Sequence, residues 1–277
     1  MAAAKGENET LTAQHTELTA LNTEKTAAYT TLQQDYDALA SLPDTILQVR
    51  EEYGNYVRQL EEMVMDGSSD LRICYLTFDD GPNSLTGDVL DKLDEWDVYA
   101  TFFTIGTNSA PGQAENLRRE MMGGHTVGNH TYSHDIFGYL YTSLEEFSTQ
   151  VLLQDQKVYD ATGFHTQLFR FPSGSVYCGF FEEAEAWLEE NGFYWIDWNA
   201  SAWDSGFHSF EVGGRKISDN VWSTTQDLDI AVVLCHDFNY STYLGLDIMI
   251  PELREEGFIF LPLFPQSHML DEPLPVI

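Results

Sequence analysis

Beyond residue 70 the chain alternates short apolar runs with longer amphipathic segments, and this alternation restricts its fold more than any other feature. Seven strand-like runs lie near residues 71–78, 98–105, 125–128, 167–171, 193–198, 230–235 and 258–263. Helical patterns separate them, at residues 85–95, 112–122, 143–161, 180–191, 213–224 and 243–256. Such alternation is typical of a parallel sheet covered by helices. About seven units in roughly 200 residues favour an α/β fold of the distorted (β/α) barrel type over an open sheet.

The first 66 residues lack this alternation and have the composition of long helices. Between Glu9 and Leu42 there is no Gly or Pro, and leucines recur at heptad spacing, interrupted by polar residues. After Pro43 a cleaner apolar seam alternates spacings of three and four: Ile46, Val49, Tyr53, Tyr56, Leu60 and Met63. We predict a helical, coiled-coil-like arm over residues 1–66 and a second domain over residues 67–277. The arm is either a stalk or dimerisation element, or an extension packed on its own domain.

Composition and charge narrow the classes of partner. Against 13 Lys and Arg stand 45 Asp and Glu, a formal charge of −32 that repels nucleic-acid backbones and anionic lipid surfaces. No apolar run is long enough to cross a membrane, and residues 1–6 contain no apolar core of a signal peptide. The three cysteines have neither the number for a disulfide framework nor the spacing of zinc ligands. We therefore expect a globular protein with no nucleic-acid partner and no membrane span.

Two adjacent carboxylates, Asp79 and Asp80, end the first strand-like run and precede the turn signal Gly81-Pro82. Consecutive side chains of a regular strand face opposite ways, so both acids serve one site only where the strand curls into its loop. Two like charges side by side need a cation, an arginine or a shared proton to offset their repulsion. The alternative is a solvated turn, for which Asp and Gly are ordinary residues.

Two histidines, His130 and His134, follow the third strand-like run. Four residues apart, they share one face of a helical turn and can bind one cation. Together with the acid pair they predict a centre of two histidines and one carboxylate, whose open coordination position is typical of catalytic metals. Zinc, cobalt, nickel, manganese and iron all suit this set of donors.

Three later strand ends carry further polar side chains. Arg170 ends the fourth run, where its fork of donors can hold a carboxylate ionised. The aromatic and acidic residues 195–204 end the fifth run and suit a sugar ring, or else they are core filler beside an acidic loop. His236 ends the sixth run and is either a general acid or a core histidine. These side chains gather at the strand ends where barrels of this type hold their catalytic residues.

In this order, the strand ends resemble the five motifs of the polysaccharide deacetylases of the NodB-homology family, also called carbohydrate esterase family four. The likeness covers residues 71–263. The family's Thr-Phe-Asp-Asp-Gly occurs unchanged at residues 77–81, its His-(Ser/Thr)-x-x-His at 130–134, its Arg-x-Pro-x-Gly at 170–174 and its Leu-x-His at 234–236. The resemblance implies a metal-dependent enzyme that folds as a distorted barrel of seven or eight strands.

The resemblance also implies a role for each matched residue. It makes Asp79 the general base, His236 the general acid, and Asp80, His130 and His134 the ligands of a divalent metal, most simply zinc.

The same comparison gives roles to residues around these. It implies that Arg170 orients Asp79 and that an aspartate tunes His236. Asp204 occupies the position of that aspartate, but the tryptophan that often follows it in the family is Ser205 here, so Asp197 is a rival. Substrate contacts are expected from four residues: Leu234, Pro172, Trp198 and Tyr132.

The implied reaction is hydrolysis of N-acetyl groups on an amino-sugar polymer. We favour bacterial peptidoglycan as this carbohydrate partner, because the arm could hold the enzyme away from a surface and no chitin-binding appendage is evident. Acetylxylan esterase and chitin-oligomer deacetylase are the alternatives, and a glycan-binding scaffold protein is the alternative outside enzymes. The expected location is extracellular or at the cell surface, with a homodimer formed through the arm.

Overall fold

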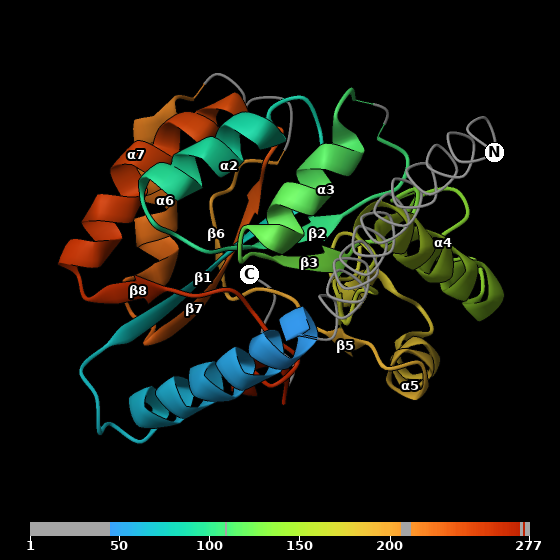
Figure 1. Cartoon of the computed structure of the whole chain (residues 1–277), viewed down its shortest axis with the longest axis horizontal. Helices are drawn as coiled ribbons and strands as arrows, with labels where there is room; N and C mark the ends of the chain where they lie inside the picture. The colour runs from blue at the N-terminus through green and yellow to red at the C-terminus, as the bar shows by residue number, and fades with distance from the viewer. Residues whose placement is uncertain (1–44, 109, 206–211, 272–273, 275–277) are drawn as a thin grey trace, which may run out of the picture. The chain divides into compact units, whose positions relative to one another are not determined.

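The computed structural model describes residues 45–108, 110–205, 212–271 and 274 (Figure 1). The chain divides into two compact units, Met1–Val49 and Arg50–Ile277. Of the first unit only residues 45–49 are described, and they are helical. The leucine heptads between Glu9 and Leu42 lie outside the described residues.

Eight strands, all paired in parallel, form one sheet in the described part of the second unit. Their bounds are β1 Arg72–Gly81, β2 Thr101–Thr104, β3 Thr126–Asn129, β4 Leu168–Phe169, β5 Tyr194–Trp195, β6 Ala200–Ser201, β7 Ile230–His236 and β8 Phe258–Phe260. The order along the sheet is β5-β4-β3-β2-β1-β7-β6, and β8 pairs with the first residues of β1. All seven strand-like runs of the sequence are strands, and only the short β6 is additional.

Helices alternate with these strands, and Figure 1 shows them outside the sheet. The α-helices that follow β1 are α2 Thr86–Glu95, α3 Gln113–Met122, α4 Leu144–Thr162, α5 Phe181–Glu190, α6 Gly214–Thr225 and α7 Tyr240–Glu255. Two short 3₁₀ turns, η1 Ser175–Tyr177 and η3 His268–Leu270, complete the elements. None of the helices in the described ranges combines the length and apolar character that a membrane span requires. The alternation confirms the predicted α/β class.

The two end strands of the sheet are neighbours in the sequence. Tyr194–Trp195 and Ala200–Ser201 are consecutive in the chain, yet β5 pairs with β4 and β6 pairs with β7, at opposite ends of the strand order. One segment therefore joins both ends of the sheet, which curls into the predicted distorted barrel. Because all strands are parallel, their C-terminal ends gather at one mouth of this barrel.

Strand β1 separates the two parts of the core because its side chains alternate between faces. Cys74, Leu76 and Phe78 are buried in the cluster that includes residues of α2, α6 and α7. Ile73 and Tyr75 are buried in the cluster inside the barrel. The same alternation directs the next odd-numbered residues, Thr77 and Asp79, toward the barrel interior. Both contact Arg170 there.

Residues 45–65 form a helix, and its part from residue 50 onward packs on the barrel. Its buried residues are Gly54, Val57, Glu61 and Val64, of which the two valines belong to the core cluster inside the barrel. The Tyr75 hydroxyl donates to Glu61 Oε1 at 2.6 Å. The sequence analysis assigned this helix to the arm and expected its seam on Ile46, Val49, Tyr53, Tyr56, Leu60 and Met63. The structure packs residues 50–65 on the barrel, which is one of the two alternatives. The packed face holds Val57, Glu61 and Val64, with Tyr53 and Leu60 of the expected seam half-buried against the same core cluster.

Candidate active site

The two carboxylates at the end of β1 reach the same mouth because a bulge interrupts the strand. Asp79 pairs with Phe103 of β2 and Gly81 pairs with Thr104, so Asp80 is the extra residue. The φ of Asp80 is 70°, in the left-handed region that residues other than glycine rarely occupy. A bulge removes the alternation of neighbouring side chains locally. This geometry supplies the curl that two adjacent acids need to serve one site.

Gly81 completes the bulge and packs against the buried carboxylate of Asp237. Asp237 accepts hydrogen bonds from Asn83 Nδ2 at 2.7 Å and from the hydroxyl of Thr86. Burial raises the pKa of Asp237 to about 7, and the hydrogen bond from Thr86 opposes that rise. The loop that follows the acid pair is thus anchored to the end of β7.

We expect Gly81→Ala to destabilise the fold by about 1–3 kcal/mol, because overpacking a fixed site has costs of that size. A Cβ at this position would overlap Oδ2 of Asp237, and this carboxylate cannot move without losing the hydrogen bonds that Asn83 gives to Oδ1 and Thr86 gives to Oδ2. Urea unfolding measures the effect. Gly179→Ala is the matched control, since a Cβ there meets nothing within 4 Å. Equal stability of the two variants would contradict the packing argument.

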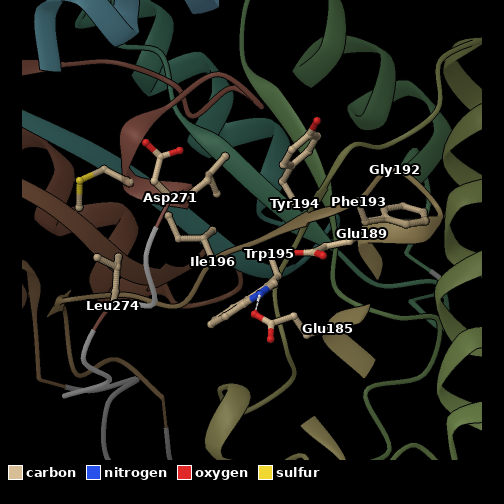
Figure 2. A pocket seen from close by; sticks show the side chains of 11 residues that line it. Glu185, Glu189, Gly192, Phe193, Tyr194, Trp195, Ile196, Asp271 and Leu274 are labelled. Atoms are coloured by element: carbon tan, nitrogen blue, oxygen red, sulfur yellow. Dashed lines mark hydrogen bonds between the residues drawn. The ribbon is translucent and has the colours of Figure 1, made fainter. Parts of the chain in front are cut away.

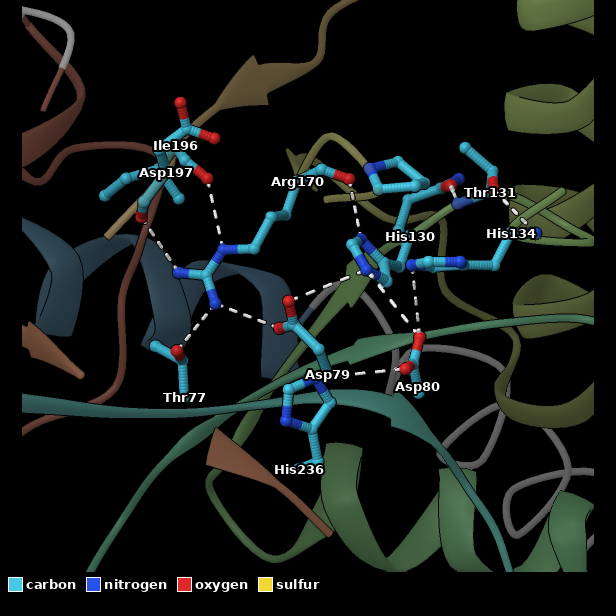
Figure 3. A network of polar contacts seen from close by, with 12 residues as sticks. Thr77, Asp79, Asp80, His130, Thr131, His134, Arg170, Ile196, Asp197 and His236 are labelled. Carbon is cyan, nitrogen blue, oxygen red and sulfur yellow. Dashed lines mark hydrogen bonds and ion pairs between the residues drawn. The ribbon is translucent and has the colours of Figure 1, made fainter. Parts of the chain in front are cut away.

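Asp80, His130 and His134 form the one group of potential metal ligands among the described residues. Their ligand atoms all lie within 4.8 Å of one another. Asp80 Oδ1 is 3.7 Å from His130 Nε2 and 3.6 Å from His134 Nε2, and Figure 3 shows the three side chains converging. His134 has a φ of 54°, and its backbone N–H donates to the Thr131 hydroxyl at 3.2 Å. The loop is therefore held in an uncommon conformation that turns both histidines toward Asp80.

The protonation of this group fits a divalent cation. Burial, aided by the charge of His134, lowers the pKa of His130 to about 3, so its imidazole is neutral. His130 Nδ1 lies 2.8 Å from the Arg170 carbonyl oxygen, to which it donates, leaving the lone pair of Nε2 toward Asp80. Asp80 Oδ1 is buried and has no hydrogen-bond partner in the part of the chain that the structure describes. A buried carboxylate oxygen of that kind requires a partner, and a metal held by two imidazoles supplies one.

Arg170 lies inside the barrel and is fully buried. Its Nη1 donates to Asp79 Oδ1 at 2.9 Å and to the Thr77 hydroxyl at 2.6 Å. Its Nε and Nη2 donate to the carbonyl oxygens of Ile196 and Asp197. The guanidinium also lies 4.1 Å from the centre of a phenylalanine ring, that of Phe103. The side chain of Arg170, the residue after β4, thus ties together β1, β2 and the segment between β5 and β6.

Asp79 is buried beside this guanidinium, with its second oxygen, Oδ2, 3.5 Å from His130 Nε2. Burial raises the pKa of Asp79, and the charge of Arg170 opposes the rise. Because Arg170 holds Oδ1, the orientation of Oδ2 toward the histidines is fixed. Asp79 is therefore a stronger base than an exposed aspartate and has one oxygen free to accept a proton.

His236 ends β7 across from this pair and contacts Asp204. His236 Nδ1 lies 2.8 Å from Asp204 Oδ1, and its backbone N–H donates to Asp204 Oδ2 at 2.7 Å. Burial alone would lower the pKa of His236, but the charge and hydrogen bond of Asp204, with the charges of Asp80 and Asp79, raise it to about 9. His236 Nε2 faces the centre, 3.9 Å from Asp80 Oδ2.

The structure shows which of the two candidate aspartates, Asp204 or Asp197, contacts His236. Asp197 accepts hydrogen bonds from the hydroxyl and backbone N–H of Ser175, at 2.5 Å and 3.1 Å to its nearer oxygens. Asp204 accepts a further bond from the Thr242 hydroxyl at 2.6 Å, and Asn239 Nδ2 donates to its carbonyl. Only Asp204 of the two therefore contacts His236 in the described structure.

The residues expected to bind substrate occupy different depths. Tyr132 is half-buried and accepts backbone hydrogen bonds from residues 106 and 107, and Pro172 and Leu234 are buried close to the mouth. Trp198 is 7% exposed and lies in the core cluster, with its ring 5.7 Å from the Arg170 guanidinium. It lies beside Arg170 within the barrel, and the expected contact of Trp198 with substrate stays a prediction. Trp203, 53% exposed with a φ of 51°, is the exposed tryptophan of that segment.

Sequence reasoning missed three residues that hold the site: Thr77, Asn239 and Thr242. Thr77 fixes Arg170, whereas Asn239 and Thr242 fix Asp204. The alternation of β1 could have identified Thr77, because it shares a face with Asp79. Asn239 caps α7, accepting from the backbone of Ser241 and Thr242. A cap of that type has the same sequence signal whether or not it serves a site.

A cleft of about 350 Å³ opens beside the centre and is lined by Asp80, Asn83, Ile105, Asn108, Ser133, His134 and Phe238. The cleft reaches the two half-buried members of the ligand group, Asp80 and His134. A barrel mouth with two histidines and a carboxylate, flanked by a buried acid and a protonated histidine, is typical of metal-assisted hydrolases.

Comparison with known proteins agrees with this class. The sequence model of the family described as polysaccharide deacetylase matches residues 66–187. A peptidoglycan-N-acetylglucosamine deacetylase of Bacillus cereus is 30% identical over 199 residues, which are 71% of this chain and 71% of that protein. The chain belongs to the polysaccharide deacetylase family, as its motifs predicted.

A second relative and a crystal structure show how much of each chain the similarity covers. The peptidoglycan-N-acetylglucosamine deacetylase PgdA of Listeria monocytogenes is 31% identical over 191 residues, 68% of this chain and 37% of the Listeria protein. The chain therefore spans little more than a third of that relative. The crystal structure of the catalytic domain of a peptidoglycan N-acetylglucosamine deacetylase from Eubacterium rectale has a TM-score of 0.67 and 32% identity, covering 72% of this chain and 91% of that domain.

Proposed function

We propose that this enzyme hydrolyses N-acetyl groups of N-acetylglucosamine polymers, with bacterial peptidoglycan as its substrate. The observation that carries the proposal is the pairing of a base and an acid around one centre. Asp79 Oδ2 lies 3.5 Å from His130 Nε2, and His236 Nε2 lies 3.9 Å from Asp80 Oδ2. An amide requires both proton removal from water and proton delivery to nitrogen, and these two groups are prepared for those tasks.

Each side chain has a defined task in this scheme. Asp79 accepts a proton from the attacking water on Oδ2, while Arg170 keeps Oδ1 occupied. His236, protonated because of Asp204, gives the proton at Nε2 to the departing amine nitrogen. Leu234 is buried near the end of β7 and borders the mouth, where the acetyl methyl group would lie. Each proton transfer of this kind is worth about 10²–10⁴-fold in rate.

Asp80, His130 and His134 would hold the divalent cation. When bound, such a cation supplies a Lewis acid for the acetyl carbonyl and lowers the pKa of a water. The donor set is that of zinc, and cobalt, nickel, manganese and iron share it.

The substrate is tested by measuring released acetate on three polymers: purified peptidoglycan, N-acetylglucosamine oligomers and acetylated xylan. We expect release from the first two, faster on peptidoglycan, because the relatives named above are deacetylases of that polymer. Release from acetylxylan alone would identify an esterase instead. Glycan binding without acetate release from any of the three would contradict an enzymatic role.

We also propose that the helix at residues 45–65 forms a homodimer and holds the enzyme at the bacterial cell surface. The side chains of Val49, Tyr56 and Met63 are exposed, seven residues apart, beside the face that packs on the barrel. Residues seven apart supply one of the two apolar positions of a coiled-coil seam, and a second copy presents the same residues.

A double variant, Tyr56→Glu with Met63→Glu, is expected to convert the dimer to a monomer, because it places charges in the seam. Light scattering after size-exclusion chromatography measures the mass. Asn55→Asp, exposed on the same helix outside the seam, is the matched control and should leave the mass unchanged. A wild-type protein that is monomeric at micromolar concentration would overturn the proposal.

A further inference from the structure

Among the residues that line the cleft at the barrel mouth, Asn108 holds the backbone of a candidate metal ligand. Asn108 lies between β2 and α3 and lines the cleft together with Asp80 and His134. Its Nδ2 donates to the backbone carbonyl oxygen of Asp80 at 2.6 Å. The pocket of about 260 Å³ beside β5 shares no lining residue with the cleft and holds no member of the ligand group (Figure 2). The contact of Asn108 is therefore made at the candidate metal centre.

The backbone of Asp80 requires support because its conformation is unfavourable. Its φ of 70° lies in the left-handed region, which costs free energy for a residue with a Cβ. Such a conformation persists only where the surrounding contacts hold it. The carbonyl group of a residue turns with its ψ angle, so a donor fixed on the carbonyl oxygen of Asp80 also fixes the backbone from which the carboxylate projects. Asn108 supplies that donor.

The bond from Asn108 is one of three that hold this loop. The carbonyl oxygen of Gly81 accepts from the backbone N–H of Ile105 at 2.8 Å. The carbonyl oxygen of Pro82 accepts from Gln113 Nε2 at 3.2 Å. The segment from the end of β2 to the start of α3 thus supplies donors to three consecutive carbonyl oxygens. Of the three bonds, the one from Asn108 acts on a candidate ligand itself.

The same segment holds the loop that carries the two histidines. The backbone N–H groups of Gly106 and Thr107 both donate to the carbonyl oxygen of Tyr132, at 2.7 Å and 2.8 Å. A Cβ on Gly106 would overlap the ring of Tyr132, so the absence of a side chain permits this close approach. Residues 105–108 therefore connect the loop of Asp80 to the loop of the histidines.

We propose that Asn108 is a positioning residue for the metal centre. Its amide holds Asp80 in the left-handed conformation that directs the carboxylate toward His130 and His134. The proposal rests on the metal site of the proposed function. Residues that orient a ligand without touching the metal change metal affinity by about 10–100-fold when they are removed. Loss of the Asn108 amide leaves all three ligands in the chain but releases the backbone of Asp80.

The test is the affinity of the full-length protein for zinc and for cobalt, measured by competition with a chromophoric chelator. Asn108→Ala removes the donor and should bind both ions about 10–100-fold more weakly than the wild type. Asn108→Gln keeps an amide donor on a longer side chain and should bind more tightly than Asn108→Ala. Asn191→Ala is the matched control, because Asn191 Nδ2 also donates to a backbone carbonyl oxygen, that of Trp187 at 2.8 Å. This control should bind both ions like the wild type.

The visible spectrum of bound cobalt reports the geometry of its ligands, which a general loss of stability does not alter. At saturating cobalt, Asn108→Ala should differ from the wild type in this spectrum, and Asn191→Ala should not. Equal affinities and equal spectra of these two variants would overturn the proposal. A wild-type protein that binds the ions no more tightly than Asp80→Ala would overturn the metal centre and the proposal with it. None of these results depends on acetate release, so they are separate from the test of the substrate.

Discussion

Asp79→Asn is expected to lower the turnover of acetate release by about 10²–10⁴-fold, the usual contribution of one general base. Asparagine keeps the shape of the side chain but cannot accept the proton of water. Its oxygen can still receive the hydrogen bond that Arg170 Nη1 now gives to Asp79 Oδ1, so the fold should be retained. Initial rates on N-acetylglucosamine oligomers measure the effect, at saturating substrate and with added zinc.

Metal content separates this role from a general disturbance of the site. Asp79 is not in the group of Asp80, His130 and His134, so the variant should bind metal like the wild type. Asp88→Asn, on the first turn of α2, is the control and should leave the rate unchanged. An Asp79→Asn enzyme with wild-type turnover would contradict the assignment of the base.

Arg170→Leu is expected to lower the free energy of unfolding by about 3–5 kcal/mol, the range seen when one partner of a buried ion pair is removed. Asp79 would keep its burial and lose its positive partner. The hydroxyl of Thr77 and the carbonyl oxygens of Ile196 and Asp197 would lose their donors too. Leucine fills part of the volume over Phe103 but satisfies none of these groups. Urea unfolding followed by circular dichroism measures the loss.

The control for this substitution is Arg118→Leu. Arg118 is half-exposed on α3 and pairs with Glu115 at 3.0 Å, an arrangement worth about 1 kcal/mol or less. If Arg170→Leu proved as stable as Arg118→Leu, the network around Arg170 would not hold the barrel together as inferred here.

The fold and the metal-binding group were accessible from sequence because their signals are local. Asp79 and Asp80 are neighbours, and His130 and His134 are four residues apart, so each pair is recognisable within a few residues of its strand end. The strands were recognisable because apolar runs separate helices with clear amphipathic patterns. The parallel sheet then brings the strand ends together without further information.

Other features depend on contacts between distant segments and were harder to predict from the sequence. The choice of Asp204 over Asp197 depends on how the chain turns after β5, which residue types alone do not determine. The helix at residues 45–65 carries two adjacent apolar faces, and the buried one includes Glu61, whose partner Tyr75 lies on β1. A polar residue weakens an apolar pattern, so the sequence favoured the other face. Trp198 is buried for a related reason, since it packs near a guanidinium inside the barrel.

The most direct test of the central claim is acetate release from N-acetylglucosamine oligomers by chelated enzyme, before and after zinc or cobalt is restored. We expect no release without metal and full release on its return in the wild type. Asp80→Ala, which removes the carboxylate whose Oδ1 has no protein partner among the described residues, should show little recovery. Release that is equal in chelated and metal-restored enzyme would contradict a metal-assisted deacetylase at Asp80, His130 and His134.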